Sequence, residues 1–194
     1  MMGLLAGLAA AALAAASPAP PPTVDELVAR NIAARGGRER LRAVASLRMT
    51  GRLTPGAPAV EAPIRLELKR PDRIRMELTF QGMTAVQAYD GKTGWQIAPF
   101  RGQSVPVFMS EEEREQALEQ ADVDGPLVDY KEKGHTLELV GPDKVGEADA
   151  WRMKLALKNG TVRDVYLDAS TFLEIQTVSK RRIRGDLVEA ESRL

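Results

Sequence analysis

The middle of the sequence alternates apolar and polar residues with the period of β-strands. Apolar residues stand at every second position from Ile64 to Leu68 and again from Ile74 to Phe80. Successive side chains of a strand point to opposite faces, so each run has one apolar and one polar face. The pattern predicts consecutive antiparallel strands whose apolar face needs a cover. Turn-forming residues separate the runs at Arg70-Pro71-Asp72, Gln81-Gly82 and Asp90-Gly91.

Strand patterns also fill most of the remaining chain. A clean alternation recurs from Trp151 to Leu157, and Lys158-Asn159-Gly160-Thr161 after it is the strongest hairpin turn of the sequence. The predicted strands are residues 46–53, 61–70, 73–80, 83–90, 94–98, 135–141, 151–158, 162–168, 172–183 and 186–194.

Three short segments carry helix signals instead. Thr23 and Glu26 have the spacing of a capping box, and Gly36-Gly37 ends the helix that they open. A second short helix is expected directly after these glycines. Ser110 is a suitable N-cap for a third helix, because the acids at positions 111–113 complement the positive end of its dipole.

This order of elements predicts an α+β fold built on one large antiparallel sheet. A sheet of nine or ten strands curls or closes rather than staying flat. The predicted helices are too few and too short to cover so large an apolar face. The uncovered part must then meet a ligand, a partner or the rest of a barrel.

The motifs in these elements resemble a known family. Their order is similar to that in the periplasmic lipoprotein carriers of the localisation pathway (LolA) and the wider outer-membrane lipoprotein-sorting superfamily. The resemblance covers most of the chain after Pro22. It rests on Ala34-Arg35-Gly36-Gly37, Lys69-Arg70-Pro71, Asp90-Gly91-Lys92-Thr93, Trp95, Pro99-Phe100 and Tyr166-Leu167-Asp168.

The resemblance implies a specific architecture and role. In this family a curved antiparallel sheet forms an incomplete β-barrel, and short helices cover its concave face, which holds acyl chains. The carriers receive cargo from an inner-membrane transporter and pass it to an outer-membrane acceptor without breaking a bond. The family usually continues beyond the equivalent of Leu194 with another strand pair, which leaves a C-terminally truncated domain as one alternative.

The N-terminus predicts export. An alanine-leucine run of about thirteen residues is too short to span a bilayer but suits a signal peptide within residues 1–19, although no Lys or Arg precedes it. Residues 1–22 are therefore expected to be a signal peptide and a proline-rich linker, and residues 23–194 a single domain. The expected location is the periplasm. The alternatives are a wrongly placed start and a short uncleaved anchor.

Composition excludes several function classes. The 27 basic and 27 acidic residues cancel, which gives no electrostatic case for nucleic acid. The chain has no cysteine, and so has no lipidation site, disulfide or thiolate nucleophile. Its only histidine, His135, is expected at a solvated turn, and no cofactor or metal is expected.

A phosphate-loop pattern and an acidic run each have a simpler explanation than nucleotide binding or catalysis. Gly91-Lys92-Thr93 matches the end of a phosphate loop, but Val86 stands where the loop requires glycine, so a hairpin turn is favoured. The consecutive acids Glu111, Glu112 and Glu113 do not share a helical face, so they do not form a catalytic pair. We expect no enzyme activity.

The apolar strand residues are the candidate binding site. They are either an ordinary core or the wall of a lipid pocket, and flexible methionines among them favour varied acyl chains. The candidates for the concave face are Leu66, Leu68, Ile74, Met76, Leu78, Phe80, Val86, Trp95, Trp151, Met153 and Leu155.

Two functions therefore stand at this point. The first is a monomeric, non-catalytic periplasmic carrier or binding protein for the acyl chains of lipoprotein or phospholipid. The second is an envelope-stress sensor or protein-interaction module on the same scaffold, because a fold does not fix a function.

Overall fold

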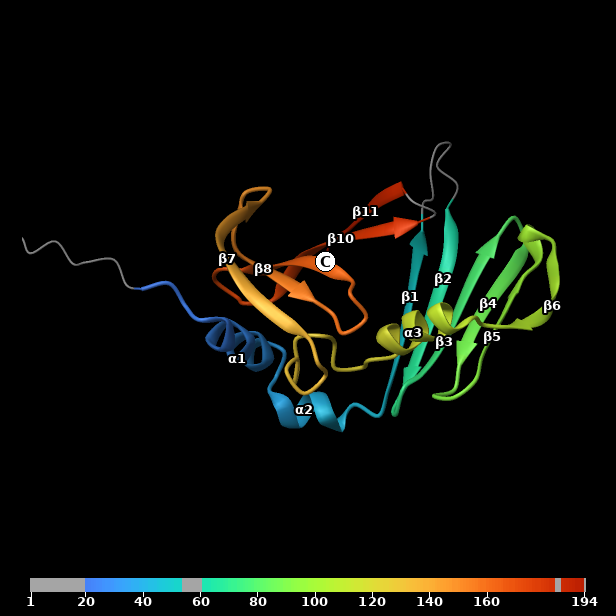
Figure 1. Cartoon of the computed structure of the whole chain (residues 1–194), viewed down its shortest axis with the longest axis horizontal. Coiled ribbons are helices and arrows are strands. Elements are labelled where there is room, and N and C mark those ends of the chain that lie inside the picture. The colour runs from blue at the N-terminus through green and yellow to red at the C-terminus, as the bar shows by residue number, and fades with distance from the viewer. Residues whose placement is uncertain (1–19, 54–60, 184–185, 194) are drawn as a thin grey trace, which may run out of the picture.

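The computed structural model describes residues 20–53, 61–183 and 186–193. The predicted signal peptide at residues 1–19 lies outside this part. The described chain is α+β, as predicted, and its helices are few and short (Figure 1). They are α1 (Val24–Ala34), α2 (Arg38–Ala43), α3 (Glu111–Gln120) and the 3-10 helix η1 (Pro99–Arg101).

Eleven strands form two antiparallel sheets in the described part of the chain. The first sheet has six strands in sequence order, β1 (Ser46–Leu53), β2 (Ala62–Lys69), β3 (Arg73–Phe80), β4 (Met83–Tyr89), β5 (Gly94–Ala98) and β6 (Gln103–Phe108). The second sheet has the order β11-β10-β9-β8-β7, from β7 (Thr136–Val145), β8 (Ala148–Ala156), β9 (Val162–Asp168), β10 (Glu174–Ile183) and β11 (Asp186–Arg193).

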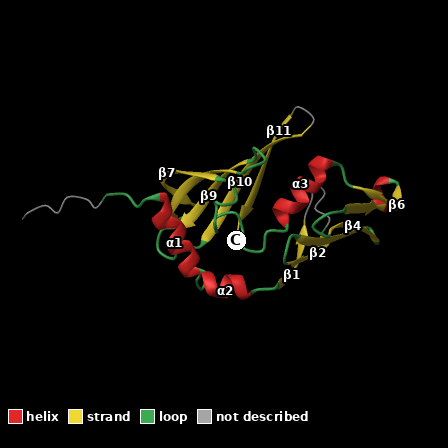
Figure 2. Ribbon diagram, turned by 60° about the horizontal axis from the view of Figure 1, so that its bottom comes forward, coloured by secondary structure: helices red, strands yellow, loops and turns green. Residues whose placement is uncertain are grey.

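The sequence predicted one large sheet, whereas hydrogen bonding divides the strands into two. The segment from Met109 to His135 separates β6 from β7, and it contains α3 and a series of turns. Figure 2 shows α3 on the side of the six-stranded sheet that faces the second sheet. The two sheets thus form an open, curved assembly with α3 between them.

The predicted helix caps are present. The Oγ1 of Thr23 accepts from the Glu26 amide at 3.2 Å, and the Thr23 amide donates to the Glu26 carboxylate at 2.7 Å. Ser110 forms the same reciprocal pair with Glu113 at 3.2 and 2.8 Å. Each pair satisfies amides that the first turn of a helix leaves without partners.

The turn at Asp90 confirms that the phosphate-loop pattern is a hairpin. One carboxylate oxygen of Asp90 accepts from the amides of Lys92 and Thr93 at 2.9 and 2.7 Å, between β4 and β5. Gly91 has a φ of 97°, which a residue with a side chain rarely adopts. Strand β5 follows directly, where a phosphate loop would require a helix.

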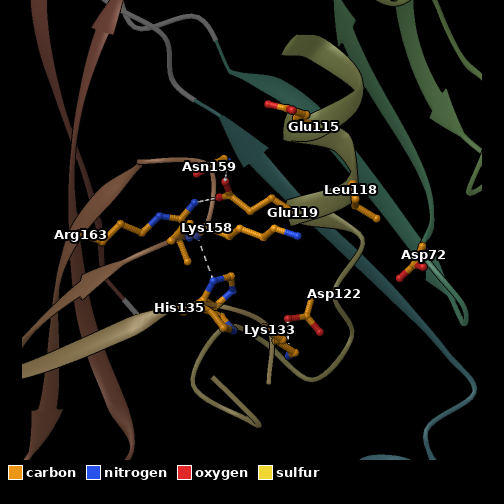
Figure 3. Close-up of a pocket in the computed structure, with 12 residues that line it drawn as sticks. Asp72, Glu115, Leu118, Glu119, Asp122, Lys133, His135, Lys158, Asn159 and Arg163 are labelled. Atoms are coloured by element: carbon orange, nitrogen blue, oxygen red, sulfur yellow. Dashed lines mark hydrogen bonds and ion pairs between the residues drawn. The ribbon is translucent and has the colours of Figure 1, made fainter. Parts of the chain in front are cut away.

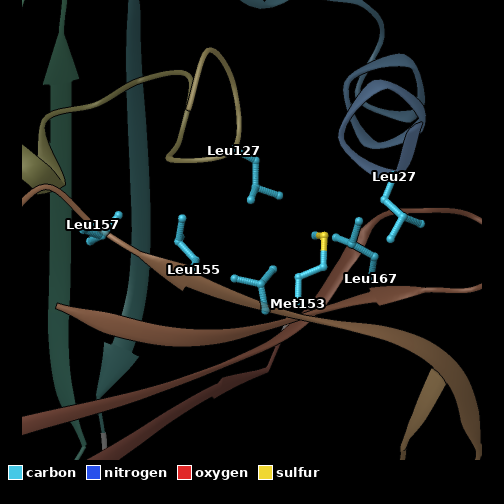
Figure 4. Packing of buried hydrophobic residues seen from close by; sticks show 7 residues of the cluster. Leu27, Leu127, Met153, Leu155, Leu157 and Leu167 are labelled. Carbon is cyan, nitrogen blue, oxygen red and sulfur yellow. The ribbon is translucent and has the colours of Figure 1, made fainter. Parts of the chain in front are cut away.

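The main core lies against the second sheet. Leu27 from α1 and Leu127 from the turn after α3 point toward this sheet (Figure 4). Asn31 of α1 is 1% exposed and donates to the Phe172 carbonyl at 2.8 Å, which fixes the helix to the turn between β9 and β10. The buried members of this core are Leu27, Leu127, Met153, Leu155, Leu157, Val165 and Leu167.

Candidate functional site

The strand register separates the six-stranded sheet into two chemically different faces. Directly paired residues of neighbouring strands share a face. Met49 pairs with Leu66, Leu66 with Met76, and Met76 with Gln87, so these residues lie on one face. Ala117 of α3 packs in the same cluster as Leu68 and Ile74, which identifies this as the inner face.

Helix α3 covers only one end of the inner face. Its apolar contacts come from Ala117 and, just after its end, Ala121, which pack near Leu68 and Ile74. Glu113 also accepts a hydrogen bond from the Gln96 side chain of β5 at 2.8 Å. At the start of the helix, Met109 lies directly over Gly94. A Cβ atom on Gly94 would lie 2.3 Å from the Met109 sulfur, so only glycine allows this approach.

Beyond α3 the inner face is largely apolar, and η1 covers part of it, since Phe100 packs edge-on against Phe80 with the ring centroids 6.0 Å apart. The side chains at the far end are unusually exposed for their type, with 44% of Met49, 44% of Leu53 and 68% of Val105 accessible. Between them Met76, Leu78 and Phe80 are half-buried. A contiguous apolar surface of this kind marks an interaction site in a soluble protein.

The structure groups six of the predicted site residues on this face. Their alternation in β2 and β3, together with the pairing of Leu66 with Met76 and Leu68 with Ile74, brings their side chains to one side. Leu68 and Ile74 are buried beneath α3, and Leu66 packs against the same cluster. Phe80 contacts Phe100 of η1, and Met76 and Leu78 are half-buried. The six are Leu66, Leu68, Ile74, Met76, Leu78 and Phe80.

Five predicted site residues lie elsewhere. Val86 pairs with Glu77 and Trp95 with Ala88, which places both on the outer face, so the expectation of a shared concave face does not hold for them. Trp151, Met153 and Leu155 belong to the second sheet, where Met153 and Leu155 are fully buried core. Alternation within each strand is visible in a sequence, but the relative register of β3, β4 and β5 is not.

Several residues of the open face were not among the predicted candidates. Ile64 continues the alternation of β2. The other residues lie in β1, β4 and β6, and the pairing of these strands with β2, β3 and β5 places them on this face. Their spacing of two within each strand was the available signal. They are Leu47, Met49, Leu53, Ile64, Met83, Val105 and Val107.

A cavity of about 470 Å³, lined by charged side chains and by apolar surface, lies on the other side of α3, toward the second sheet (Figure 3). Glu119 of α3 forms an ion pair with Arg163 of β9 and accepts from the Asn159 side chain at 2.7 Å. These contacts connect the helix to the second sheet. Leu118 and Leu157 supply apolar parts of the lining.

His135 lines this cavity and is half-buried, rather than solvated at a turn as predicted. Its Nδ1 accepts from the Lys158 amide at 3.1 Å, so the neutral ring carries its proton on Nε2. Burial, and then the charge of Lys133, lower the pKa of His135, while Asp122 opposes the shift. The ring is therefore neutral at pH 7.

Arg70, from the Lys69-Arg70-Pro71 motif, joins three elements. Its guanidinium donates to both carboxylate oxygens of Asp124 at 2.8 and 2.5 Å. It also donates to the carbonyls of Leu41 and Val44, at 3.1 and 2.8 Å. The hydrogen bond from Arg70 lowers the pKa of Asp124, which keeps the pair charged. This contact fixes α2 and the turn after α3 to the end of β2.

No group of three or more His, Cys, Asp or Glu side chains among the described residues could hold a metal ion. In the same residues, no helix has the length and hydropathy needed to cross a membrane.

Similar architectures occur among solved structures. A domain named for outer membrane lipoprotein sorting, from Vibrio parahaemolyticus, superposes with a TM-score of 0.51 and 12% sequence identity over 85% of this chain and 75% of that one. The chain has a LolA-like fold. No protein-family model and no curated protein matches the sequence.

Two further solved structures share the LolA-like arrangement less closely. A LolA superfamily protein from Nitrosomonas europaea gives a TM-score of 0.48 at 11% identity, over 86% of this chain and 75% of that one. A DUF1329 family protein from Desulfovibrio piger gives 0.47 at 12% identity, over 88% and 86%.

Proposed function

We propose that the protein is a non-catalytic carrier or binding protein for acylated cargo in the bacterial periplasm. Its ligand is the acyl chain of a lipoprotein or a phospholipid, bound on the inner face of the six-stranded sheet. The observation that carries this proposal is the partly exposed apolar surface around Met49, Met76 and Leu78. The LolA-like fold supports it, because it resembles that of a domain named for lipoprotein sorting.

The energetics suit a carrier that must also release its cargo. Each buried methylene contributes about 0.8 kcal/mol, so a chain of about fourteen carbons contributes on the order of 10 kcal/mol before costs. Ordering the ligand and moving α3 offset much of this gain. The apolar contacts of α3 with the sheet are the small side chains of Ala117 and Ala121, and displacing the helix would also break the hydrogen bond between Glu113 and Gln96.

The transfer route belongs to the same proposal. By analogy with lipoprotein carriers, cargo would arrive from an inner-membrane transporter and leave to an outer-membrane acceptor. The N-terminal apolar run of the sequence supports export to the compartment between those membranes.

Native mass spectrometry tests the proposal directly. The chain is produced with its N-terminal segment in a Gram-negative host, purified from the periplasm, and its bound lipid is extracted. Discrete added masses that extract as phospholipid or acylated peptide are expected. An unliganded mass that persists after incubation with both ligand types contradicts the proposal and favours a protein-interaction module.

A matched pair of variants locates the binding surface. Leu78→Gln changes a half-buried residue of the inner face, and Val86→Gln changes a half-buried residue of the outer face. Leu78→Gln is expected to remove most of the bound lipid, whereas Val86→Gln leaves it unchanged. Equal loss in both variants would mean that the inner face is not the site.

A further inference from the structure

The outer face of the six-stranded sheet combines cationic and aromatic side chains in one continuous row. The register aligns Arg48 with Glu67, Glu67 with Arg75, Arg75 with Ala88, Ala88 with Trp95 and Trp95 with Phe108. No described element packs on this side of the sheet, because α3 lies on the other face. The row runs from a charged half, β1 to β3, to an aromatic half, β5 and β6.

The charged half is strongly basic although the whole chain is neutral. Six cationic residues occupy outer positions of β1, β2 and β3, and three carboxylates accompany them, which leaves an excess of three positive charges. The cations are Arg48, Arg52, Arg65, Lys69, Arg73 and Arg75, and the carboxylates are Glu61, Glu67 and Glu77.

The local carboxylates do not neutralise this excess. Glu67 is shared by two arginines, Arg65 at 2.5 Å and Arg48 at 2.8 Å. Lys69 and Arg73 form no ion pair with any residue that the structure describes. The carboxylate of Asp90 accepts from the backbone amides of Thr93 and Lys92, which are the main cause of its lowered pKa, and the charge of Arg73 adds a smaller contribution without forming an ion pair.

A hollow of about 510 Å³ opens in the basic half. Four of its lining residues are the cations Arg48, Lys69, Arg73 and Arg75, and Glu67 is the only acid among them. Guanidinium and ammonium groups on several sides of a hollow match the oxygens of a phosphate.

The aromatic half identifies the kind of partner. Phe108 is 79% exposed at the edge of the sheet, and the Arg75 guanidinium lies 5.9 Å from the centre of the Trp95 ring. Trp and exposed Phe beside Lys and Arg are typical of surfaces that contact the headgroup region of a bilayer. Pro106 has no amide hydrogen, which limits pairing of β6 with a strand from another protein.

We propose that this outer face docks on the surface of an anionic phospholipid bilayer. Lipid phosphates occupy the basic hollow, and Phe108 inserts among the headgroups. The inner face then stays free on the opposite side of the sheet. This inference goes beyond the acyl-chain site and does not depend on it.

Vesicle flotation with the full chain tests the proposal. The vesicles contain phosphatidylethanolamine alone or phosphatidylethanolamine with phosphatidylglycerol. Binding is expected only to the vesicles with phosphatidylglycerol, and it should weaken as salt is raised. Equal binding to both compositions, or binding to neither, overturns the proposal.

Charge variants locate the contact. Lys69→Gln with Arg73→Gln is expected to weaken binding about tenfold or more, since each cation near an anionic surface contributes about fivefold. Arg114→Gln with Lys154→Gln is the matched control, because it removes two exposed cations from other surfaces. Equal weakening in the control means that net charge alone drives binding, which overturns the proposal. Circular dichroism confirms that both variants fold.

Three further arms separate the bilayer from other sources of anionic charge. Phe108→Ser should weaken binding severalfold, and Leu78→Gln should leave it unchanged. Inorganic phosphate or poly-glutamate, at constant ionic strength, should not displace the protein from vesicles. Displacement by phosphate would assign the hollow to free phosphate. Displacement by poly-glutamate would assign the outer face to an acidic protein. Loss of vesicle binding in Leu78→Gln would assign that binding to the inner face. Each of these results overturns the proposal.

Discussion

The two sheets use similar apolar strands for different purposes. On the second sheet, Leu27 of α1 and Leu127 close over Met153 and Leu155, and no solvent reaches those two strand residues. On the first sheet, the apolar cover that α3 provides at one end is small, from Ala117 and Ala121, and strand residues beyond it such as Met49 and Leu53 stay 44% exposed. One sheet therefore has a core that stabilises the fold, and the other has a surface that is free to bind.

The largest effect is expected when one leucine side chain of each sheet is truncated to alanine and the two losses of stability are compared. Leu155→Ala should lower the free energy of unfolding by about 3 kcal/mol, because it leaves a cavity in a closed core. Leu78→Ala should lower it by about 1 kcal/mol or less, since the side chain is already half exposed. Urea denaturation measures both.

An equal loss of stability in the two variants would contradict the comparison. It would mean that the inner face of the first sheet is part of the folding core. Leu78→Ala should also reduce lipid binding, whereas Leu155→Ala should not when assayed below its unfolding transition.

The next largest effect is expected at Arg70, which joins the end of β2 to α2 and to the turn after α3. Arg70→Ala should destabilise the fold by about 2 kcal/mol, because it leaves the Asp124 carboxylate and two carbonyls without their shared donor. Arg48→Ala, at an exposed pair, is the control and should cost less than about 0.5 kcal/mol. Thermal and urea unfolding compare the two.

The same contact gives a pH dependence with a defined sign. Arg70 holds the folded-state pKa of Asp124 below its ordinary value, so the carboxylate stabilises the fold above the unfolded pKa of about 3.9. That stabilisation is lost as the pH falls through the folded-state pKa. Asp124→Asn should lower stability at pH 7 and flatten the acid limb of the stability curve. An unchanged acid limb would show that Asp124 does not contribute to it.

The smallest effect separates the two capped helices. Ser110→Ala and Thr23→Ala each remove a side chain that accepts from an amide of the first turn, which costs about 1 kcal/mol. Hydrogen exchange should show that Ser110→Ala loosens α3 locally, because α3 has little packing beneath it. Thr23→Ala should lower global stability, since α1 is part of the closed core. Global unfolding of similar size in both variants would argue against a weakly held α3.

Local chemistry in the sequence predicted much of the fold. Alternation gave β2, β3 and β8, and capping boxes gave the starts of α1 and α3, because these signals lie within a few residues of each other. The division into two sheets depends on hydrogen bonds between distant strands, which no local pattern encodes. Val86 and Trp95 show the same limit for the site, since a strand can present its apolar residues to either side.

Gly94 sets how far α3 stands above the sheet. The Met109 sulfur occupies the place of a Cβ on this residue, and Ser110 caps the helix immediately afterwards. A single methyl group at position 94 would displace the Met109 side chain from this place. Variation at this one position would thus act on the entry to α3 through Met109, without a change in any side chain of the helix itself.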